Sequence, residues 1–531
     1  MKIKNLILGL AAISALSLTT SCVQDGIVDP APDSGVKAYM TLRLVGENMA
    51  TRTVGGPTEL GSAEENKITS AAILLCDILT KEVRYAYNVS DGMTATGEGV
   101  RTKPIQVSVG TFEVYVIANA GNVGINAYES VTGKTIEMVT EDLMRNAYAG
   151  ANSFIMFNEC NGTDDTDGAL IVITEDNSYD RPATCDPIKL DRLAAKIQSR
   201  VFADDGFGIS GVQDEGSFIT DVTLEGFKLL NGATQVNLQQ RWTNLAGSTA
   251  SGSEGATWKN TLVTPWLSAG DNAGGSRYYN ALAGFRTINK TVAPDGSEDY
   301  TLVKDLYEGI PAYGATPTSP IYVMENNPTW DGTQPVEAKN GNTTGLVYRF
   351  KATVPDSDGR AGENCFYGYD GKFFATLEAL QAKFPGVFMA NGGADAATQL
   401  ANAAAELAAA TDEDQISDFR AKYLVKVYKG GIMYYTHFIK DKNYEDAAGK
   451  RYYSVMRNTI YDLTVRNLLR IGTDVPGGWN PEVDPEDPVD NKNVYMVVEV
   501  KVNPWVLSIE DIDLGGTPGG GGGGELPPVL I

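Results

Sequence analysis

The sequence predicts a mainly β protein in which β-sandwich domains carry small helical insertions. Two segments, one near each end of the chain, alternate apolar and polar residues with the period of two that is typical of a strand with one buried face. Short strand-like runs bounded by glycine recur between them, and helical patterns are confined to two stretches. A chain of 531 residues exceeds the usual size of one hydrophobic core, so we expect at least two domains.

The two terminal segments match each other in spacing. The first carries its apolar residues at Val36, Ala38, Met40, Leu42 and Leu44. The second repeats this spacing at Val494, Met496, Val498, Val500 and Val502. Each segment is predicted to be a strand that buries five apolar side chains on one face.

The N-terminus is typical of a lipoprotein leader. Lys2 and Lys4 precede an apolar run over residues 6–18, which is shorter than the roughly 20 residues of a membrane-spanning helix. Small residues then lead into Cys22. This pattern predicts a signal peptide over residues 1–21 and lipid modification of Cys22, with an ordinary secretory signal as the alternative.

A protease-accessible loop follows the first strand. Residues 48–56 are polar and small, and Arg52 is the only basic residue between Arg43 and Lys67. Cleavage between Arg52 and Thr53 would release residues 22–52, a lipidated propeptide that contains the first strand. The fold would keep an empty groove of about five apolar pockets, which a second copy of the chain could fill.

Composition excludes several function classes. The chain has 43 Lys and Arg against 67 Asp and Glu, and a net charge of -24 argues against a nucleic-acid partner. The single histidine, His437, lies in an alternating run and is expected to be structural, which excludes His-dependent triads unless it serves alone. The acidic loops at 164–168 and 356–359 do not fit the EF-hand template. We therefore predict no enzyme activity and no catalytic, cofactor-binding or metal-binding residues.

The remaining cysteines suggest structural roles. Cys76 lies in an apolar run and is expected to be a small buried side chain. Cys160 and Cys185 lie in polar, turn-rich stretches, and a disulfide between them stays open.

Glycine turns and helix signals predict further elements. Residues 105–109 and 112–117 are predicted to form a hairpin through Gly110, and residues 423–428 and 432–439 another through Gly430 and Gly431. Residues 461–465 form a further strand candidate. Helices are expected at 376–384 and at 394–410, the latter as a surface insertion.

Loop-forming composition predicts the domain limits. An N-terminal domain is expected over residues 53–187 and a C-terminal domain over 188–514. The Pro- and Asp-rich stretch 481–493 is expected to let the final strand swing away from the body. Residues 515–531 contain six consecutive glycines and are expected to form a flexible tail.

The C-terminal region resembles a known family. Residues 453–465, the Pro- and Asp-rich linker, residues 495–505 and the Asp-Ile-Asp-Leu run at 511–514 resemble the major subunit of the minor fimbriae of Bacteroidales, a type V pilin of the fimbrilin family. The hairpin that contains Tyr434 and Tyr435, the leader, the first strand and Arg52 fit that family in the same order.

The resemblance implies two transthyretin-like β-sandwich domains and export as an outer-membrane lipoprotein precursor. It further implies cleavage after Arg52 by an arginine-specific protease and head-to-tail polymerisation with other copies by exchange of a donor strand at 494–507, which includes Trp505. Surface fimbriae that support adhesion, biofilm formation and virulence are the expected product, with accessory fimbrial subunits as partners.

Other functions stay open, and one of them rests on a departure from the family. The chain continues through residues 515–531, past the point at which the family's stalk subunit ends, so an accessory or tip subunit is an alternative. A lipid-anchored glycan- or peptide-binding protein is another, for which the candidate aromatic residues are Trp242, Trp258, Trp266 and Trp330. A secreted hydrolase would need a clustered carboxylate pair, which the sequence does not show.

Overall fold

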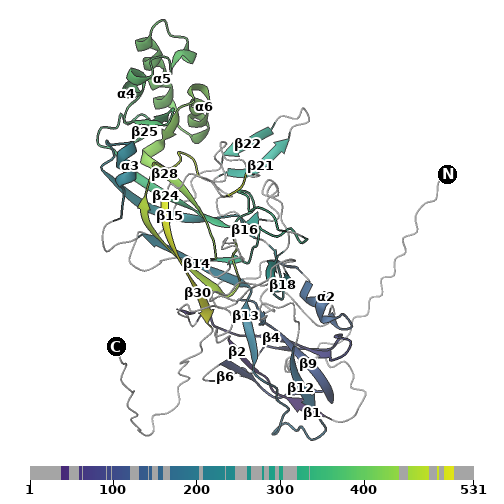
Figure 1. The fold of residues 1–531 in the computed structure, drawn as a ribbon. Helices are drawn as coiled ribbons and strands as arrows, with labels where there is room; N and C mark the ends of the chain where they lie inside the picture. The colour runs from purple at the N-terminus through teal and green to yellow at the C-terminus, as the bar shows by residue number, and fades with distance from the viewer. Residues whose placement is uncertain are drawn as a thin grey trace, which may run out of the picture.

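The computed structural model describes most of the chain between residues 37 and 506. The described residues are 37–46, 59–62, 64–90, 93–96, 99–119, 131–141, 143–145, 154–159, 168–201, 207–233, 235–244, 260–264, 278–279, 286–292, 298–302, 320–333, 335–441, 453–476, 487–489 and 496–506. They form two β-rich domains that lie end to end, with a helical cluster at the end of the C-terminal domain (Figure 1). The prediction of a mainly β chain with β-sandwich domains and small helical insertions is confirmed.

The N-terminal domain is built from a nine-stranded sheet and a two-stranded sheet. The larger sheet has the order β5-β4-β9-β11-β13-β2-β7-β6, and β12 pairs with β9; the smaller sheet is β1-β8. The strands are β1 (Ala38–Met40), β2 (Arg43–Gly46), β4 (Ala71–Asp77), β5 (Val83–Val89), β6 (Met93–Thr96), β7 (Gly99–Thr102), β8 (Ile105–Val107), β9 (Gly110–Ala118), β11 (Met156–Asn158), β12 (Ala169–Ile173) and β13 (Ile188–Arg192).

Both sheets of this domain enclose one apolar core. Ile73 of β4 and Val100 of β7 belong to the same buried cluster although their strands stand far apart in the sheet order, so the large sheet curls around the core. The opposite face of β4 and β9 packs against helix α2 (Ile136–Glu141), which buries Ile136 and Val139 there. Cys76 lies fully buried in this second cluster, as predicted, and burial raises the pKa of its thiol to about 12.

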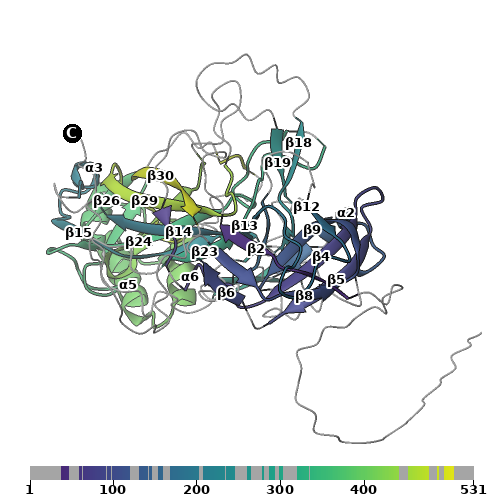
Figure 2. The same ribbon diagram turned by 90° about the horizontal axis from the view of Figure 1, so that it is seen from below.

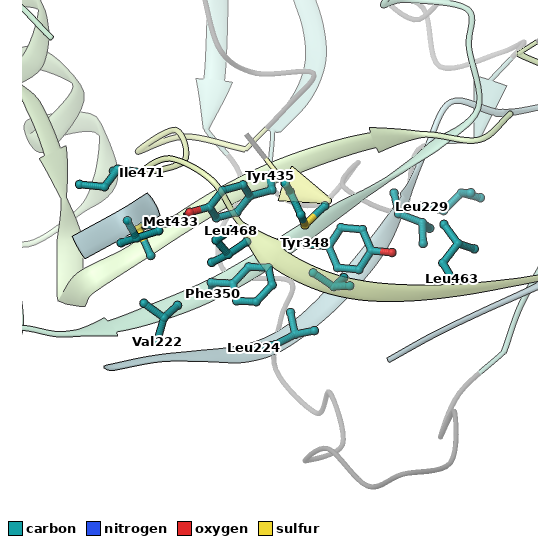
Figure 3. Packing of buried hydrophobic residues seen from close by; sticks show 14 of the residues in the cluster. Val222, Leu224, Leu229, Tyr348, Phe350, Met433, Tyr435, Leu463, Leu468 and Ile471 are labelled. Atoms are coloured by element: carbon teal, nitrogen blue, oxygen red, sulfur yellow. Dashed lines mark hydrogen bonds between the residues drawn. The ribbon is translucent and has the colours of Figure 1, made fainter. Parts of the chain in front are cut away.

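The C-terminal domain is a second sandwich. A five-stranded sheet, β23-β14-β29-β30-β3, faces a three-stranded sheet, β15-β24-β28. Its strands are β3 (Glu59–Leu60), β14 (Ala194–Val201), β15 (Asp221–Leu230), β23 (Ile321–Met324), β24 (Gly345–Thr353), β28 (Ile432–Phe438), β29 (Thr459–Leu468) and β30 (Met496–Val506). Side chains of both sheets, among them Tyr348, Phe350 and Leu463, interdigitate in its core (Figure 3).

Smaller strand pairs flank the two sandwiches. They are β10 (Leu143–Arg145) with β17 (Gln235–Asn237), β16 (Gly232–Ala233) with β20 (Tyr278–Tyr279), β18 (Arg241–Asn244) with β19 (Asn260–Val263), and β21 (Arg286–Val292) with β22 (Glu298–Leu302). Helix α3 (Ser210–Glu215) precedes β15 at the far end of the C-terminal domain. No helix in the described part of the chain combines the length and the hydropathy needed to cross a bilayer.

The helical cluster contains both predicted helices and one that the prediction missed. Helix α4 (Leu377–Lys383) is capped by Thr376, and α5 (Ala396–Ala409) is capped by Asp395. The missed helix is α6 (Glu413–Tyr423), whose start is capped by the Asp412 side chain. With the short helix η3 (Met389–Asn391), these helices pack on a three-stranded sheet made of β26 (Lys372–Phe374), β25 (Phe366–Tyr369) and β27 (Lys426–Tyr428).

In neither predicted hairpin do the two strands pair with each other. β8 pairs with β1, whereas β9 pairs with β4, β11 and β12, so the turn at Gly110 carries the chain from one sheet to the other. The Gly430 and Gly431 turn likewise joins β27, which pairs with β25, to β28, which pairs with β24. The glycines mark true turns, since Gly430 and Gly431 have φ of 62° and 78°, but the strand partners come from elsewhere in the fold. The strand predicted at 461–465 is confirmed within β29.

The chain passes from one sandwich to the other at Leu193. β13 pairs with β11 and β2 of the N-terminal sheet, whereas β14 pairs with β23 and β29 of the C-terminal sheet. The limit expected from the sequence, between residues 187 and 188, lies at the start of β13. Seen from below, the strands of the N-terminal sandwich lie on one side of this passage and those of the C-terminal sandwich on the other (Figure 2).

Candidate strand-exchange site

The N-terminal apolar segment forms two strands in two different sheets. β1 pairs antiparallel with β8, and β2 pairs parallel with β13 on one side and antiparallel with β7 on the other. The sequence predicted one continuous strand over these residues. The chain instead crosses from one sheet to the other at Thr41 and Leu42.

Hydrogen bonds at this crossing explain the break in the strand. The Thr41 hydroxyl donates to the Thr102 carbonyl oxygen at 2.6 Å, and the Leu42 N–H donates to the Thr102 hydroxyl at 3.0 Å. The Thr41 side chain is thus buried, although strict alternation would have placed it on the polar face. A threonine accepts this position because its hydroxyl finds a partner inside the fold.

The predicted apolar side chains of the segment fill the core of the N-terminal domain. Ala38, Met40, Leu42 and Leu44 are each at most 1% exposed. They share one cluster with side chains of β7, β8 and β13, such as Val100, Val107 and Leu190. Val36, Arg52, Thr53 and Cys22 lie outside the described residues.

The C-terminal segment is a strand of its own domain in this structure. β30 runs antiparallel to β29 from Met496 opposite Leu468 to Pro504 opposite Thr459. Met496 and Val502 are buried in the core of the C-terminal domain, and Val498 is half-buried against it. The Pro- and Asp-rich linker predicted that this segment swings away from the body. Residues 496–506 instead lie in the five-stranded sheet.

Of the other three residues predicted for the donor strand, two are described through their backbone pairing. Val500 pairs through its backbone with Leu463, and Trp505 pairs with Glu59 of β3. Val494 lies outside the described residues.

The two segments differ in how the sheets hold them. β2 has hydrogen-bonded neighbours on both sides, β13 and β7. Among the described residues, β30 has β29 along one side, and the two-residue strand β3 meets its other side only at Trp505 and Val506. β30 is therefore close to an edge strand over most of its length, and a strand at an edge leaves a sheet or accepts a new neighbour more readily than a central one.

Buried arginines fix the joint between the domains. Arg192, at the end of β13, donates to the Glu65 carbonyl oxygen and to the side-chain oxygens of Asn66 and Asn458. Asn458 immediately precedes β29, so Arg192 connects the two sheets. Burial lowers the pKa of Arg192 to about 9, and the nearby carboxylates of Glu65 and Asp191 oppose that shift. The group stays charged at neutral pH.

Glu65 holds the same joint from the N-terminal side. Its carboxylate accepts a hydrogen bond from the Tyr322 hydroxyl at 2.6 Å and forms an ion pair with Lys196 at 3.0 Å. Burial alone would raise the pKa of this carboxyl, but the hydrogen bonds from Tyr322, the Ser62 N–H and Lys196 outweigh it and lower the pKa. A second arginine, Arg457, pairs with Glu325, and both side chains are at most 1% exposed. Sequence reasoning missed these joint residues because their partners are distant in the chain.

The other side chains singled out by the sequence have structural surroundings. His437 lies on β28, half-buried, and burial lowers its pKa to about 4. In the acidic loop at 356–359, the Asp358 carboxylate accepts hydrogen bonds from the Tyr367 hydroxyl and the Leu377 N–H and pairs with Arg360. Within the described residues, no three His, Cys, Asp or Glu side chains gather in a way that could hold a metal ion.

The structure describes some of the tryptophans and cysteines that the sequence singled out. Trp242 and Trp330 are buried, which removes both from an exposed aromatic binding surface. Trp258, Trp266, Cys160 and the loop at 164–167 lie outside the described residues. Cys185 is half-buried and has a free thiol.

Family models match the two regions of the chain that contain the N-terminal apolar segment and β30. Residues 38–192 match the model described as major fimbrial subunit protein (FimA), from the first residue of β1 to the last residue of β13. Residues 426–511 match the model described as major fimbrial subunit protein type IV, fimbrillin, C-terminal, which begins at β27 and includes β30. Both matched models describe major fimbrial subunit families. The expected resemblance to fimbrial subunits is thereby confirmed in both regions of the chain.

Solved structures of fimbrial proteins are also similar to this chain. A fimbrilin (FimA) from Porphyromonas gingivalis W83 is 16% identical, with 90% of this chain and 99% of that chain covered and a TM-score of 0.40. The tip fimbrial protein Mfa3 from Porphyromonas gingivalis is 11% identical, with 88% and 100% covered and a TM-score of 0.37. No curated protein sequence matches the chain.

The two matched models have a direct consequence for the expected class of protein. Both describe structural subunits of fimbriae, and these families are not enzymes. Subunits of this kind associate with other subunits and with accessory proteins. The two matched regions contain the buried N-terminal segment and β30.

Proposed function

We propose that this chain is a structural subunit of surface fimbriae that polymerises by strand exchange after proteolytic removal of its N-terminal segment. The precursor is exported with the signal peptide 1–21 and carries lipid on Cys22. An arginine-specific protease cuts between Arg52 and Thr53 and releases residues 22–52. The mature subunit then comprises the two sandwiches, which meet at Leu193, and the tail 515–531.

The burial of residues 38–46 is the observation that carries this proposal. The segment contributes a strand to both sheets of the N-terminal domain, and its four described apolar side chains are almost completely buried. Arg52 follows it by only six residues, so one cut in the intervening stretch separates a whole core element from the domain. A segment so placed is a plug that proteolysis can remove.

The energy at stake is large enough to drive assembly. Burying Met40, Leu42 and Leu44 contributes about 5 to 9 kcal/mol, at the usual value for a buried aliphatic side chain. Loss of the segment also leaves backbone groups of β7, β8 and β13 without their ladder partners. Insertion of a strand from another copy restores both the apolar burial and the backbone hydrogen bonds. This favours a polymer over a monomer with an empty groove.

Residues 494–507 supply the donor strand. In the monomer β30 has a complete neighbour on one side only, so it leaves its own sheet at the cost of one ladder and of the packing of Met496 and Val502. Its apolar spacing repeats that of the removed segment. A contact in which each copy donates to the next is heterologous and does not close, so it produces a filament.

The polymer places the chain at the cell surface in fimbriae that support adhesion and biofilm formation. Accessory fimbrial subunits begin, anchor or terminate such a filament and are partners of the same groove or strand. The apolar tail residues after the glycine run, which end at Ile531, lie beyond the donor segment and are not required for the exchange.

The decisive experiment follows the mature N-terminus and the polymer together. Purified precursor is treated with an arginine-specific protease, sequenced from its N-terminus and examined by negative-stain electron microscopy. The proposal expects Thr53 as the new first residue, fibres in the micrographs and a ladder of detergent-resistant oligomers on gels. The variant Arg52→Ala is expected to remain monomeric under the same treatment. Normal-length fibres from this variant would overturn the proposal.

A further inference from the structure

Large exposed apolar side chains lie only at the two ends of the described molecule. At the end of the N-terminal domain they are Ile78, Leu79, Met138, Leu170, Val172 and Tyr179. In the C-terminal domain they are Met389 in η3, Leu424 directly after α6 and Leu469 directly after β29. Figure 1 shows the helical cluster at the end of this domain away from the N-terminal domain. Between these ends, the described part of the chain exposes no comparable side chain. Scattered apolar residues are ordinary, but their restriction to two opposite ends points to a contact.

Five of these N-terminal side chains lie on elements that adjoin one another, and we call them the N-terminal pole (Ile78, Leu79, Met138, Leu170 and Val172). Ile78 and Leu79 lie in the turn that follows β4, where Asp77 stands opposite Phe112 of β9. β12 flanks the same half of β9 on its other side and exposes Leu170 and Val172. Met138 belongs to α2, whose first residue bonds to the backbone of Lys81 in the same turn. Leu79 is 87% exposed.

The N-terminal pole adjoins the place of the removable segment. Tyr179 packs edge-on against Tyr39 of β1, with their ring centroids 5.6 Å apart. The Tyr39 N–H donates to the Asn177 carbonyl oxygen, so β1 lies against the stretch that follows β12. A subunit that enters the emptied groove therefore arrives beside this pole.

The opposite region, which we call the C-terminal pole (Met389, Leu424 and Leu469), is formed largely by the helical cluster. Met389 lies in η3 between α4 and α5 and is 66% exposed. Leu424 follows the last residue of α6 in the left-handed region, at φ 55°, and is 78% exposed. A leucine is unfavourable at such a helix end, where glycine or asparagine is usual, so its exposure there is not explained by the fold. Leu469 follows β29 at the end of that strand away from the joint.

We infer that the N-terminal pole of one subunit docks on the C-terminal pole of a second copy of this chain, as an apolar contact additional to the exchanged strand. This inference rests on the proposed head-to-tail polymer, in which opposite ends of successive copies meet. A second copy is the occupant because it presents the only other exposed large apolar side chains of the described molecule, and because the groove beside the N-terminal pole brings it there. The helical cluster is then an assembly element that orients the next subunit and stiffens the filament.

A charge-exchange experiment tests the pairing of the two poles. One variant carries Leu79→Lys and Leu170→Lys, a second carries Met389→Glu and Leu424→Asp, and a third combines all four changes. After cleavage, each of the first two is expected to elongate about tenfold more slowly and to give more flexible fibres, because a charge replaces an interface anchor. The third is expected to recover much of the rate at low salt, since opposite charges then meet across the contact. Light scattering measures elongation, and micrographs give the persistence length.

The control places the same lysines near the joint, as Thr333→Lys and Glu337→Lys, and is expected to elongate like the unmodified chain. The melting temperatures of all uncut precursors should agree, because every substituted side chain is exposed. Unchanged elongation and stiffness in the pole variants would overturn the inference, as would defects that simply add in the fourfold variant. Failure of the unmodified chain to form detergent-resistant oligomers after cleavage would instead reject the proposed function, so the two failures are distinguishable.

Discussion

The two apolar segments at the ends of this chain have the same spacing in sequence but opposite positions in the fold. Residues 38–46 lie inside the N-terminal domain, where they contribute to both sheets and β2 has a hydrogen-bonded neighbour on each side. β30 lies next to the edge of the C-terminal sheet, with one full neighbour. A central buried strand cannot leave without unfolding its domain or being cut, whereas an edge strand can peel away.

This difference matches the roles that we propose for the two segments. A plug that must stay in place during export is best held from both sides, and only a covalent event should release it. A donor must leave its own sheet without destroying the domain that it leaves. The identical spacing lets one replace the other, and the different settings decide which one moves spontaneously.

The largest expected effect comes from placing the same charge in both segments. Leu42→Asp would bury an unpaired carboxylate in the N-terminal core and is expected to destabilise the uncut precursor by about 4 kcal/mol or more, or to prevent folding. Val498→Asp changes a half-buried position in β30 and should lower the free energy of unfolding of the precursor by about 1 to 2 kcal/mol. Urea denaturation of both precursors measures the difference.

Val498→Asp has a second expected consequence. The variant precursor folds and is cleaved, but its fibres are lost because the carboxylate would then lie in the groove of the next subunit. Equal destabilisation of the precursor by the two substitutions would mean that β30 is as integral to its domain as β2, and the proposed distinction between plug and donor would fail.

The second prediction concerns strand opening in the uncut precursor. Backbone amides of β2 are expected to exchange with solvent only through global unfolding. Those of β30 should exchange through a local opening, at a rate about a hundredfold higher. Hydrogen exchange followed by mass spectrometry on peptides covering 38–46 and 496–506 checks this. β29 supplies the internal control, because it lies between β14 and β30 and should remain protected. Similar protection of both segments would contradict the comparison.

A smaller effect is expected at the crossing between β1 and β2. Thr41→Val keeps the shape of the side chain but removes the hydroxyl that donates to the Thr102 carbonyl oxygen. The precursor should lose about 1 kcal/mol, the usual net value of one buried hydrogen bond. After cleavage residue 41 is gone, so fibres from the variant should be indistinguishable from those of the unmodified chain. Altered fibre stability would show that the segment is retained.

The smallest effect is expected from the tail. Truncation after Leu514 removes a six-glycine run that is costly to order and two prolines that donate no backbone hydrogen bond. Fibre length and resistance to detergent should be unchanged in micrographs and gels. Loss of polymer in the truncated protein would make the tail part of the joint between subunits.

Local sequence signals were sufficient where local physics decides the outcome. The alternation of the first segment correctly identified Ala38, Met40, Leu42 and Leu44 as buried. Thr376 and Asp395 mark the starts of α4 and α5, as side-chain caps do. α6 had a comparable signal, since the Asp412 side chain caps the helix and the Gln415 side-chain oxygen accepts a hydrogen bond from the Thr411 N–H, but the polar surface of the helix concealed it.

The sequence by itself thus determined which apolar residues of the first segment are buried, where the chain turns and that the two ends carry apolar residues with the same spacing, because these properties depend on neighbours a few residues away. Only the tertiary structure decided the partners of each strand. The glycine turns at Gly110 and Gly430 looked like hairpins, yet both connect different sheets, because pairing follows the shared core rather than the turn. The same holds for the joint, where Arg192 finds Asn458 across 266 residues of chain. Contacts of this kind depend on how separate sheets come together, and that is also what places one terminal strand inside its domain and the other at an edge.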